Sequence, residues 1–169
     1  AVKLDGEAFF EVMSDPVNPF TVRSGQVMVS VLGTSFNVKE SENVNNVEVF
    51  VETGKVRMSM ENQDEFITLE PGDVGLAYAS SLSRTELSDP NYISWKTKDF
   101  IFVDEELGKV LRELEESYHV TIRAEGVSLD ELRITSTYKE QSIDSILETI
   151  GAAFGLNVQK KEDLYYLNP

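Results

Sequence analysis

The strongest constraint on the fold is a helical pattern that occurs twice in the chain, 36 residues apart. Large apolar side chains recur at the spacing of one helix face in residues 107–118 and again in residues 143–154. These positions are Leu107, Val110, Leu111, Leu114 and Tyr118, then Ile143, Ile146, Leu147, Ile150 and Phe154. A strand-like run follows each segment. We therefore expect two helix–strand units in tandem, with both helices packed on one shared sheet.

Polar residues before the two helices predict where each helix begins. Asp104 and Ser142 are the expected N-caps, because their side chains accept hydrogen bonds from the first helical N–H groups. Further strands are expected at residues 100–103, 134–138 and 164–167, which makes this region a small α+β domain. Trp95 is expected to anchor the first strand of this domain in its core.

Residues 1–79 show a different pattern, in which short runs of alternating apolar and polar residues are separated by turn sequences. This pattern is typical of an antiparallel β-sandwich or barrel. The clearest hairpin is expected over residues 47–60, with Glu52-Thr53-Gly54 as its loop, and a turn is expected at 43–46. Residues 80–91 have the composition of a linker, so we expect two domains, 1–88 and 92–169.

Charge and composition exclude several classes of function. The chain has 30 acidic and 15 basic residues and a formal net charge of −15. Binding to nucleic acid or to anionic membranes depends on clustered Lys and Arg, so neither partner is expected. The absence of cysteine excludes disulfides, thiolate metal sites and a cysteine nucleophile. No apolar run approaches the roughly 18 residues of a membrane span, and no signal peptide opens the sequence.

No catalytic constellation, metal site or cofactor site is expected either. His119 is the only histidine and lies at a helix–strand boundary, which favours a structural or exposed role. Thr53-Gly54-Lys55 lacks the other residues of a phosphate-binding loop. The acidic residues near residue 105 are expected on a solvated helix face, with i,i+4 pairs such as Glu105 with Lys109.

Several motifs, in the right order, resemble the FecR-type anti-sigma factors. They are VKLDGEAFFEV at residues 2–12, PFTV at 19–22, VLGTSFNV at 31–38, ETGKV at 52–56 and LEPGD at 69–73. The second half resembles the C-terminal domain of Bacteroidetes-type members, through Trp95-Lys96, residues 100–102, Leu107, Val110-Leu111 and residues 118–122. That domain is similar to the STN module of secretins and TonB-dependent transducers. The implied fold is a jelly-roll-like β-sandwich followed by a small STN-like α+β domain with two helices packed on a sheet.

The resemblance implies the periplasmic part of a single-pass inner-membrane protein. The segment that binds the sigma factor in the cytoplasm, the transmembrane helix and the first strands of the FecR domain are expected to lie outside this sequence. The implied partner is the signalling domain of an outer-membrane TonB-dependent transporter, which binds an iron chelate or a glycan. This region would relay the substrate occupancy of the transporter to an extracytoplasmic-function sigma factor, without a cofactor.

Two strands are the expected partner-binding edges, since an exposed strand can pair with another chain. Their candidate residues are Ile134, Ser136 and Tyr138 in one strand, and Leu164 and Tyr166 in the other. The alternative function is a carbohydrate-binding or adhesion module, in which Trp95 fluorescence would respond to sugar.

The family also suggests self-cleavage between Gly33 and Thr34 as the only enzymatic activity. The Thr34 hydroxyl would attack the preceding carbonyl, which requires a strained peptide and a nearby base. The competing interpretation is that Gly33 makes a tight strand corner and that Thr34 stabilises a turn.

Overall fold

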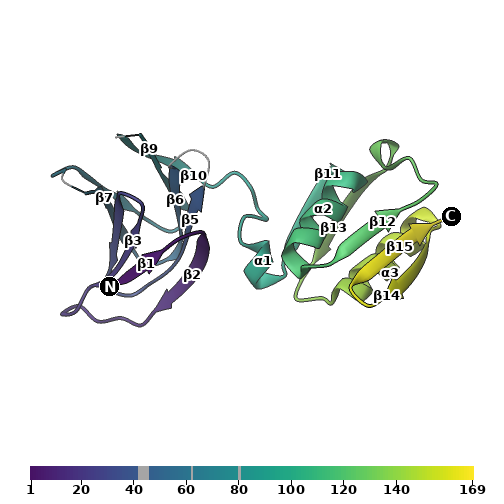
Figure 1. Cartoon of the computed structure of the whole chain (residues 1–169), viewed down its shortest axis with the longest axis horizontal. Helices are drawn as coiled ribbons and strands as arrows, with labels where there is room; N and C mark the ends of the chain where they lie inside the picture. The colour runs from purple at the N-terminus through teal and green to yellow at the C-terminus, as the bar shows by residue number, and fades with distance from the viewer. Residues whose placement is uncertain (42–45, 62, 80) are drawn as a thin grey trace. The chain divides into compact units, whose positions relative to one another are not determined.

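The chain forms two units, Ala1–Ser88 and Asp89–Pro169 (Figure 1). Each unit has its own hydrophobic core. The computed structural model describes residues 1–41, 46–61, 63–79 and 81–169. Residues 43–45 of the predicted turn and Ser80 of the predicted linker lie outside the described residues. A β-sandwich followed by a small helical part confirms the coarse fold expected from the sequence.

The first unit is a sandwich of two five-stranded sheets. The first sheet contains, in spatial order, β1 (Val2–Leu4), β3 (Phe20–Ser24), β4 (Val27–Val31), β7 (Val56–Met60) and β8 (Phe66–Leu69). The second sheet contains β10 (Ser81–Glu86), β9 (Asp73–Tyr78), β6 (Asn46–Thr53), β5 (Thr34–Ser41) and β2 (Glu7–Val12). β1 pairs with β3 in parallel, and the other neighbours are antiparallel.

Alternation along the strands builds the core between the two sheets. In β4, Val27, Val29 and Val31 are buried, whereas Met28 and Ser30 belong to the outer face. The second sheet contributes buried side chains such as Phe36 and Val49 to the same cluster. Each fully buried side chain of this size contributes about 1.5–3 kcal/mol, so the contact of the two inner faces stabilises the sandwich.

The hairpin predicted over residues 47–60 is wrong. β6 pairs with β5 and β9 in one sheet, whereas β7 pairs with β4 and β8 in the other. The chain crosses between the sheets at Gly54, where φ is +82° and a Cβ would lie 2.6 Å from the carbonyl oxygen of Gly33. A short Gly-containing loop fits a hairpin and a crossover equally well. It shows that the chain turns there, but not which strand each flanking strand pairs with.

The linker predicted at residues 80–91 is shorter than expected, because residues 81–86 form β10. This strand pairs with β9 from Ser81 opposite Tyr78 to Glu86 opposite Asp73. Its one apolar side chain, Leu82, packs against the sandwich core. An edge strand with a single buried side chain has the polar composition of a linker, which explains the incorrect prediction.

The second unit confirms both predicted helices. They are α2 (Leu107–Tyr118) and α3 (Ile143–Phe154), and the predicted positions other than Tyr118 and Phe154 are buried. Ser142 is the N-cap of α3, where its Oγ accepts a hydrogen bond from the Ser145 N–H at 3.3 Å. The predicted cap of α2 is wrong: the N-cap residue is Glu106, and Asp104 lies two residues earlier with a φ of +50°.

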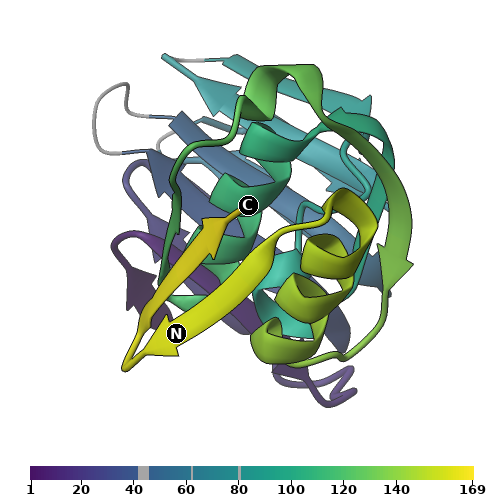
Figure 2. The same cartoon turned by 90° about the vertical axis from the view of Figure 1, so that its right-hand side faces the viewer.

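The two helices pack on two small sheets rather than on one. β11 (Phe100–Glu106) pairs with β13 (Arg133–Tyr138). β15 (Leu164–Asn168) lies between β12 (Thr121–Ala124) and β14 (Asn157–Lys161), and a 3-10 turn, η1 (Leu129–Glu131), precedes β13 (Figure 2). Both sheets and both helices share one core, which includes Phe100, Tyr138, Tyr165 and Leu167. The apolar pattern identifies the buried residues correctly but does not determine which strands pair.

Trp95 lies on a short helix, α1 (Ser94–Thr97), where it is half-buried. It is not part of the core cluster of the second unit, so the prediction that it anchors the first strand in that core is wrong. Lys98 completes this helix with a left-handed backbone conformation, φ +60°. Its Nζ donates hydrogen bonds to the carbonyl of Trp95 (2.7 Å) and to the carbonyl of Ser117 at the end of α2. Burial lowers the pKa of this ammonium group.

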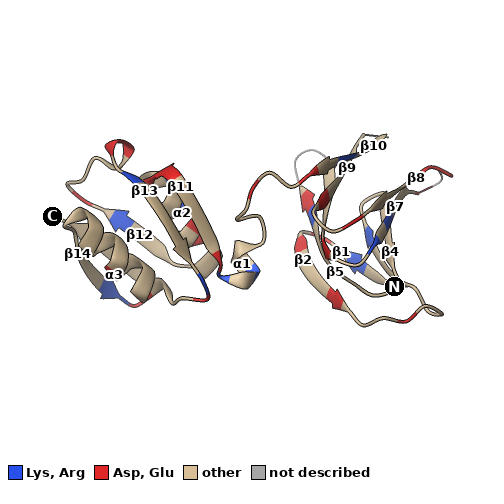
Figure 3. Ribbon diagram, turned by 180° about the vertical axis from the view of Figure 1, so that it is seen from behind, with Lys and Arg blue, Asp and Glu red and all other residues tan. Residues whose placement is uncertain are grey.

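Acidic side chains are distributed over both units (Figure 3). Within the described residues, no group of three or more Asp, Glu or His side chains is placed to hold a metal ion. The predicted pair of Glu105 with Lys109 is confirmed, at 3.0 Å.

Candidate functional site

Four strands form the edges of the two sheets in the second unit: β11 and β13 in one, β12 and β14 in the other. The backbone N–H and C=O groups of an edge strand are open to pairing with another chain unless something covers them. How each of these edges is covered therefore indicates where a partner strand can add.

The side chain of Asn91 covers the outer edge of β11. Its Oδ1 accepts a hydrogen bond from the backbone N–H of Ile101 at 2.8 Å, and its Nδ2 donates to the Ile101 carbonyl at 3.2 Å. The amide thus takes the place of the peptide group of a neighbouring strand. Nδ2 also donates to the Glu113 carboxylate on α2 at 3.0 Å, which ties the covered edge to the helix.

The edges of the other sheet are protected in a different way. Glu115 of α2 covers β12, since its Oε1 accepts a hydrogen bond from the backbone N–H of Ile122 at 2.5 Å. β14 ends in two consecutive lysines, Lys160 and Lys161. Lysines on an edge strand disfavour the addition of a further strand.

β13 has an open edge, because no strand in the described part of the chain pairs with its outer side (Figure 2). Ile101 turns both of its backbone groups toward Asn91, and therefore away from β13, and its partner across the sheet is Thr137. In an antiparallel ladder such a pair shares no hydrogen bonds, so the N–H and C=O of Thr137 also point outward. The same alternation applies to Thr135.

Exposed β-branched side chains lie beside this open edge. Ile101 is 46% exposed and Val103 is 73% exposed, and Thr135 and Thr137 are also exposed. We call these four side chains the β11–β13 face. β-branched residues pack well against a neighbouring strand, so an open backbone edge and an adjoining surface for side-chain contact occur together here.

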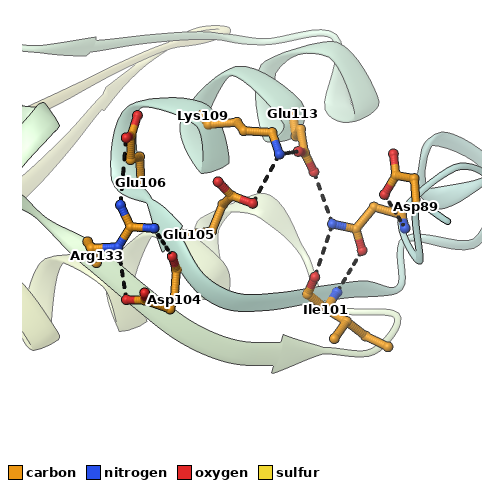
Figure 4. A network of polar contacts seen from close by, with 9 residues as sticks. Asp89, Ile101, Asp104, Glu105, Glu106, Lys109, Glu113 and Arg133 are labelled. Atoms are coloured by element: carbon orange, nitrogen blue, oxygen red, sulfur yellow. Dashed lines mark hydrogen bonds and ion pairs between the residues drawn. The ribbon is translucent and has the colours of Figure 1, made fainter.

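A network of ion pairs connects α2, β11 and β13 around this face (Figure 4). Arg133 binds the Asp104 carboxylate at 2.9 Å and its backbone carbonyl, and it lies 3.6 Å from Glu106. Lys109 lies between Glu105 (3.0 Å) and Glu113 (3.8 Å). The contacts of Arg133 join the start of β13 to the part of β11 where the pairing register with β13 shifts, between Phe102 and Glu105.

Burial raises the pKa of the Glu113 carboxyl above its ordinary value of 4.5. Asp89 and Glu105 raise it further, while the hydrogen bond from Asn91 and the charge of Lys109 act in the opposite direction. A carboxyl whose pKa is higher in the folded state than in the unfolded state stabilises the fold when it is protonated. Its stabilising contribution is therefore complete below the ordinary pKa and is lost as the pH rises through the raised pKa.

We expect Glu113→Gln to raise the melting temperature relative to the wild type at pH 7, because the variant keeps this position uncharged. The difference should shrink toward zero below about pH 4.5, where the wild-type carboxyl is protonated as well. Thermal unfolding followed by Trp95 fluorescence at several pH values measures this. Exposed Glu116 on the same helix provides the control substitution, Glu116→Gln. A Glu113→Gln effect that grows as the pH falls would contradict the assignment.

The residues predicted as partner contacts on β13 occupy different environments. Ile134 and Tyr138 are 8% and 2% exposed and belong to the core of the unit. Their side chains anchor the strand and are not available to a partner, because they alternate with the exposed threonines. Ser136 is half-buried between them.

The prediction that residues 164–167 form an edge is wrong, since β15 is the central strand of its sheet. Sequence alternation alone does not distinguish a central strand from an edge. Leu164 and Tyr166 are half-buried and alternate with the buried Tyr165 and Leu167. They therefore lie on the outer face of the sheet, where Lys161 approaches the Tyr166 ring at 5.4 Å.

Gly33 and Thr34 form a tightly packed corner of the first unit. Gly33 has a φ of +150°, and a Cβ there would lie 2.5 Å from the Cα of Ser14, so only glycine fits. The Thr34 side chain is 2% exposed, and its Oγ1 donates a hydrogen bond to the carbonyl of Lys55 at 3.0 Å. These contacts favour the structural interpretation of the pair. Self-cleavage stays a prediction, which intact mass measurement after prolonged incubation tests.

His119 is the C-cap residue of α2, exposed and with φ +55°, which confirms its assignment to an exposed position at the helix boundary. Among the helices in the described ranges, none is both long and apolar enough to cross a membrane.

A sandwich of two five-stranded sheets, followed by a small α+β unit with one open strand edge, defines a two-domain, β-rich class of protein. The profile of the family described as FecR protein matches residues 1–57, and that described as FecR, C-terminal matches residues 99–167. The chain therefore belongs to the family of FecR-type anti-sigma factors.

Solved structures provide the second comparison. The chain is similar to two crystal structures of a candidate anti-sigma factor from Parabacteroides distasonis ATCC 8503, at 1.65 and 2.50 Å resolution. Sequence identities are 28% and 27%, the matches cover 98% and 99% of this chain and 79% of the other, and both TM-scores are 0.55. The comparison with curated proteins finds no match.

Proposed function

We propose that this chain is the periplasmic, signal-receiving region of a transmembrane anti-sigma factor. In this proposal, an outer-membrane TonB-dependent transporter presents its signalling domain when it has bound its substrate. The second unit, which we propose to be STN-like, receives that domain. The jelly-roll-like sandwich joins it to the membrane-anchored segment, and the signal then reaches an extracytoplasmic-function sigma factor. Membership of the FecR family supports the regulatory role.

The observation that carries the proposal is the open edge of β13. The edges of β11 and β12 are closed by the side chains of Asn91 and Glu115, and β14 ends in lysines. Addition of a strand to an open edge uses main-chain hydrogen bonds for affinity and flanking side chains for specificity. β13 supplies outward backbone groups at Thr135 and Thr137, and the β11–β13 face supplies the flanking side chains.

Thr137→Pro is expected to weaken binding of the transporter's signalling domain at least about tenfold while the unit stays folded. Proline removes an N–H that points away from β11 and so leaves the ladder between β11 and β13 intact, as is tolerated on edge strands. The binding assay is a pull-down, followed by titration calorimetry, with the purified signalling domain of the transporter encoded beside this chain.

Thr137→Ala is the matched control, because it shortens the same side chain but keeps the N–H. It is expected to bind within about threefold of the wild type, whereas Thr137→Pro loses at least about tenfold in affinity, the equivalent of one or two hydrogen bonds. Melting curves verify that both variants fold. Undiminished binding by a folded Thr137→Pro chain would refute docking at β13.

A further inference from the structure

A groove of about 740 Å³ lies on the outer face of the first sheet, in the first unit. Its floor includes Ser30 of β4, Arg57 and Ser59 of β7, and Thr68 of β8. Residues 32–34, which connect β4 to the first residue of β5, and Pro19, before β3, also line it. The volume is in the range of sites for small molecules, about 300–1,000 Å³, and the groove is separate from the β13 edge.

The charge of this groove is opposite to that of the chain. The sequence has twice as many acidic as basic residues, yet the described residues that line the groove include Lys55 and Arg57 and no carboxylate. Lys55 forms an ion pair with Glu70 at 2.7 Å. Arg57 has no ion pair with any carboxylate in the described ranges, which leaves its charge available.

The Arg57 side chain is held in place by an aromatic ring. Its guanidinium carbon lies 3.9 Å from the centroid of the Phe66 ring. Stacking of this kind orients the guanidinium plane while its N–H groups remain free to bind a carboxylate in a bidentate way. An arginine that is oriented before binding loses less conformational entropy when an anion arrives.

Hydroxyl groups flank Arg57 on both sides. The register pairs Arg57 with Ser30 of β4 and with Thr68 of β8, and directly paired residues lie on the same face of a sheet. Hydroxyls donate and accept hydrogen bonds, as do the hydroxyls of a sugar. An oriented cation between hydroxyl side chains, on the floor of a groove of this size, suits a ligand with one anionic group and several hydroxyls.

We propose that this groove binds a small acidic saccharide, with the carboxylate of a uronic acid on Arg57 and its hydroxyls near Ser30 and Thr68. The positive lining selects an anion over a neutral sugar, and the hydroxyls select a saccharide over a simple inorganic anion. This site is independent of partner docking at β13, which involves the other unit.

The test is an NMR titration of the isotope-labelled chain with cellobiouronic acid, cellobiose and inorganic phosphate. Cellobiouronic acid carries one carboxylate in place of a hydroxymethyl group of cellobiose. It is expected to shift the amide signals of Ser30, Arg57 and Thr68 in a saturable way, with an affinity at least about tenfold higher than that of cellobiose or phosphate.

Arg57→Gln is expected to weaken cellobiouronic acid binding about tenfold, because it removes the charge-assisted hydrogen bonds. The control is Arg23→Gln, in the same sheet but outside the groove lining, where Arg23 pairs with Glu61 at 3.0 Å. Its affinity is expected to be that of the wild type. The proposal would be overturned if cellobiose or phosphate bound as tightly as cellobiouronic acid, or if no saturable shift appeared at about 10 mM. Unchanged affinity for cellobiouronic acid in a folded Arg57→Gln chain would also overturn it.

Discussion

Gly151→Ala is expected to lower the free energy of unfolding of the second unit by about 1–3 kcal/mol, although alanine normally stabilises a helix interior. Gly151 lies in α3, next to the start of β14. A Cβ at this position would lie 2.7 Å from the carbonyl oxygen of Leu156 and 2.8 Å from Cγ2 of Val158. Because one of these neighbours is backbone, the helix or the strand must move to make room.

Gly108→Ala in α2 is the matched control for this prediction. There, the nearest atoms to a new Cβ lie at 3.6 Å, an ordinary van der Waals distance. The substitution is expected to stabilise the unit by about 0.5–1 kcal/mol through helix propensity. Urea denaturation followed by the fluorescence of Trp95, the only tryptophan and a residue of the second unit, measures both effects. Shifts of the same sign for both variants would contradict the close packing of α3 on β14.

Asn91→Leu is expected to destabilise the second unit by about 2–4 kcal/mol. Leucine has a similar size but leaves the N–H and C=O of Ile101 and the carboxylate of Glu113 without the amide that now binds them. Asn91 is only 9% exposed, so water replaces these hydrogen bonds incompletely, and each unsatisfied group costs about 1–3 kcal/mol.

The same denaturation experiment tests this variant, with Asn157→Leu as the control. Asn157 is exposed at the start of β14, and its substitution is expected to change the free energy of unfolding by less than about 0.5 kcal/mol. Sedimentation velocity provides a second readout, because an uncovered β11 gives the sheet another open edge and favours self-association at high concentration. An Asn91→Leu chain that unfolds at the wild-type urea midpoint would show that this amide does not hold the edge.

The helices of the second unit were predictable because their signal is local. Leu107, Val110 and Leu114 lie on one helix face at a spacing that only an α-helix produces, and burial of that face follows directly. Ser142 was predictable as a cap for the same reason. Asp104 was not, because the strand β11 continues through it and its carboxylate binds Arg133 instead.

Strand partners were harder to predict because pairing depends on residues far apart in the sequence. Alternation identified most strands of the sandwich, but it could not show that the chain changes sheets at Gly54. β10 escaped prediction since Leu82 is its only side chain packed on the core. For a related reason, the apolar pattern predicts one sheet where the second unit has two, because both sheets bury their apolar residues against the same helices.

The open edge of β13 was predicted in part. The sequence predicts that residues 134–138 form an edge strand, with Ile134, Ser136 and Tyr138 as partner contacts. In the structure Ile134 and Tyr138 lie in the core and Ser136 is half-buried, while Thr135 and Thr137 are exposed. One signal was present in the run Phe100 to Val103, where four consecutive apolar residues place Ile101 and Val103 on the face opposite the core. The role of Asn91 had no such signal, because a side chain that completes a sheet edge is recognised only from its hydrogen bonds.

The amide of Asn91 also has a consequence for stoichiometry. A two-stranded sheet that could be extended on both sides would allow copies to add in succession and grow into a filament. With one side occupied by a side chain of the same molecule, growth stops after a single addition. If a partner strand adds at β13 as proposed, the complex is therefore expected to contain one partner for each chain.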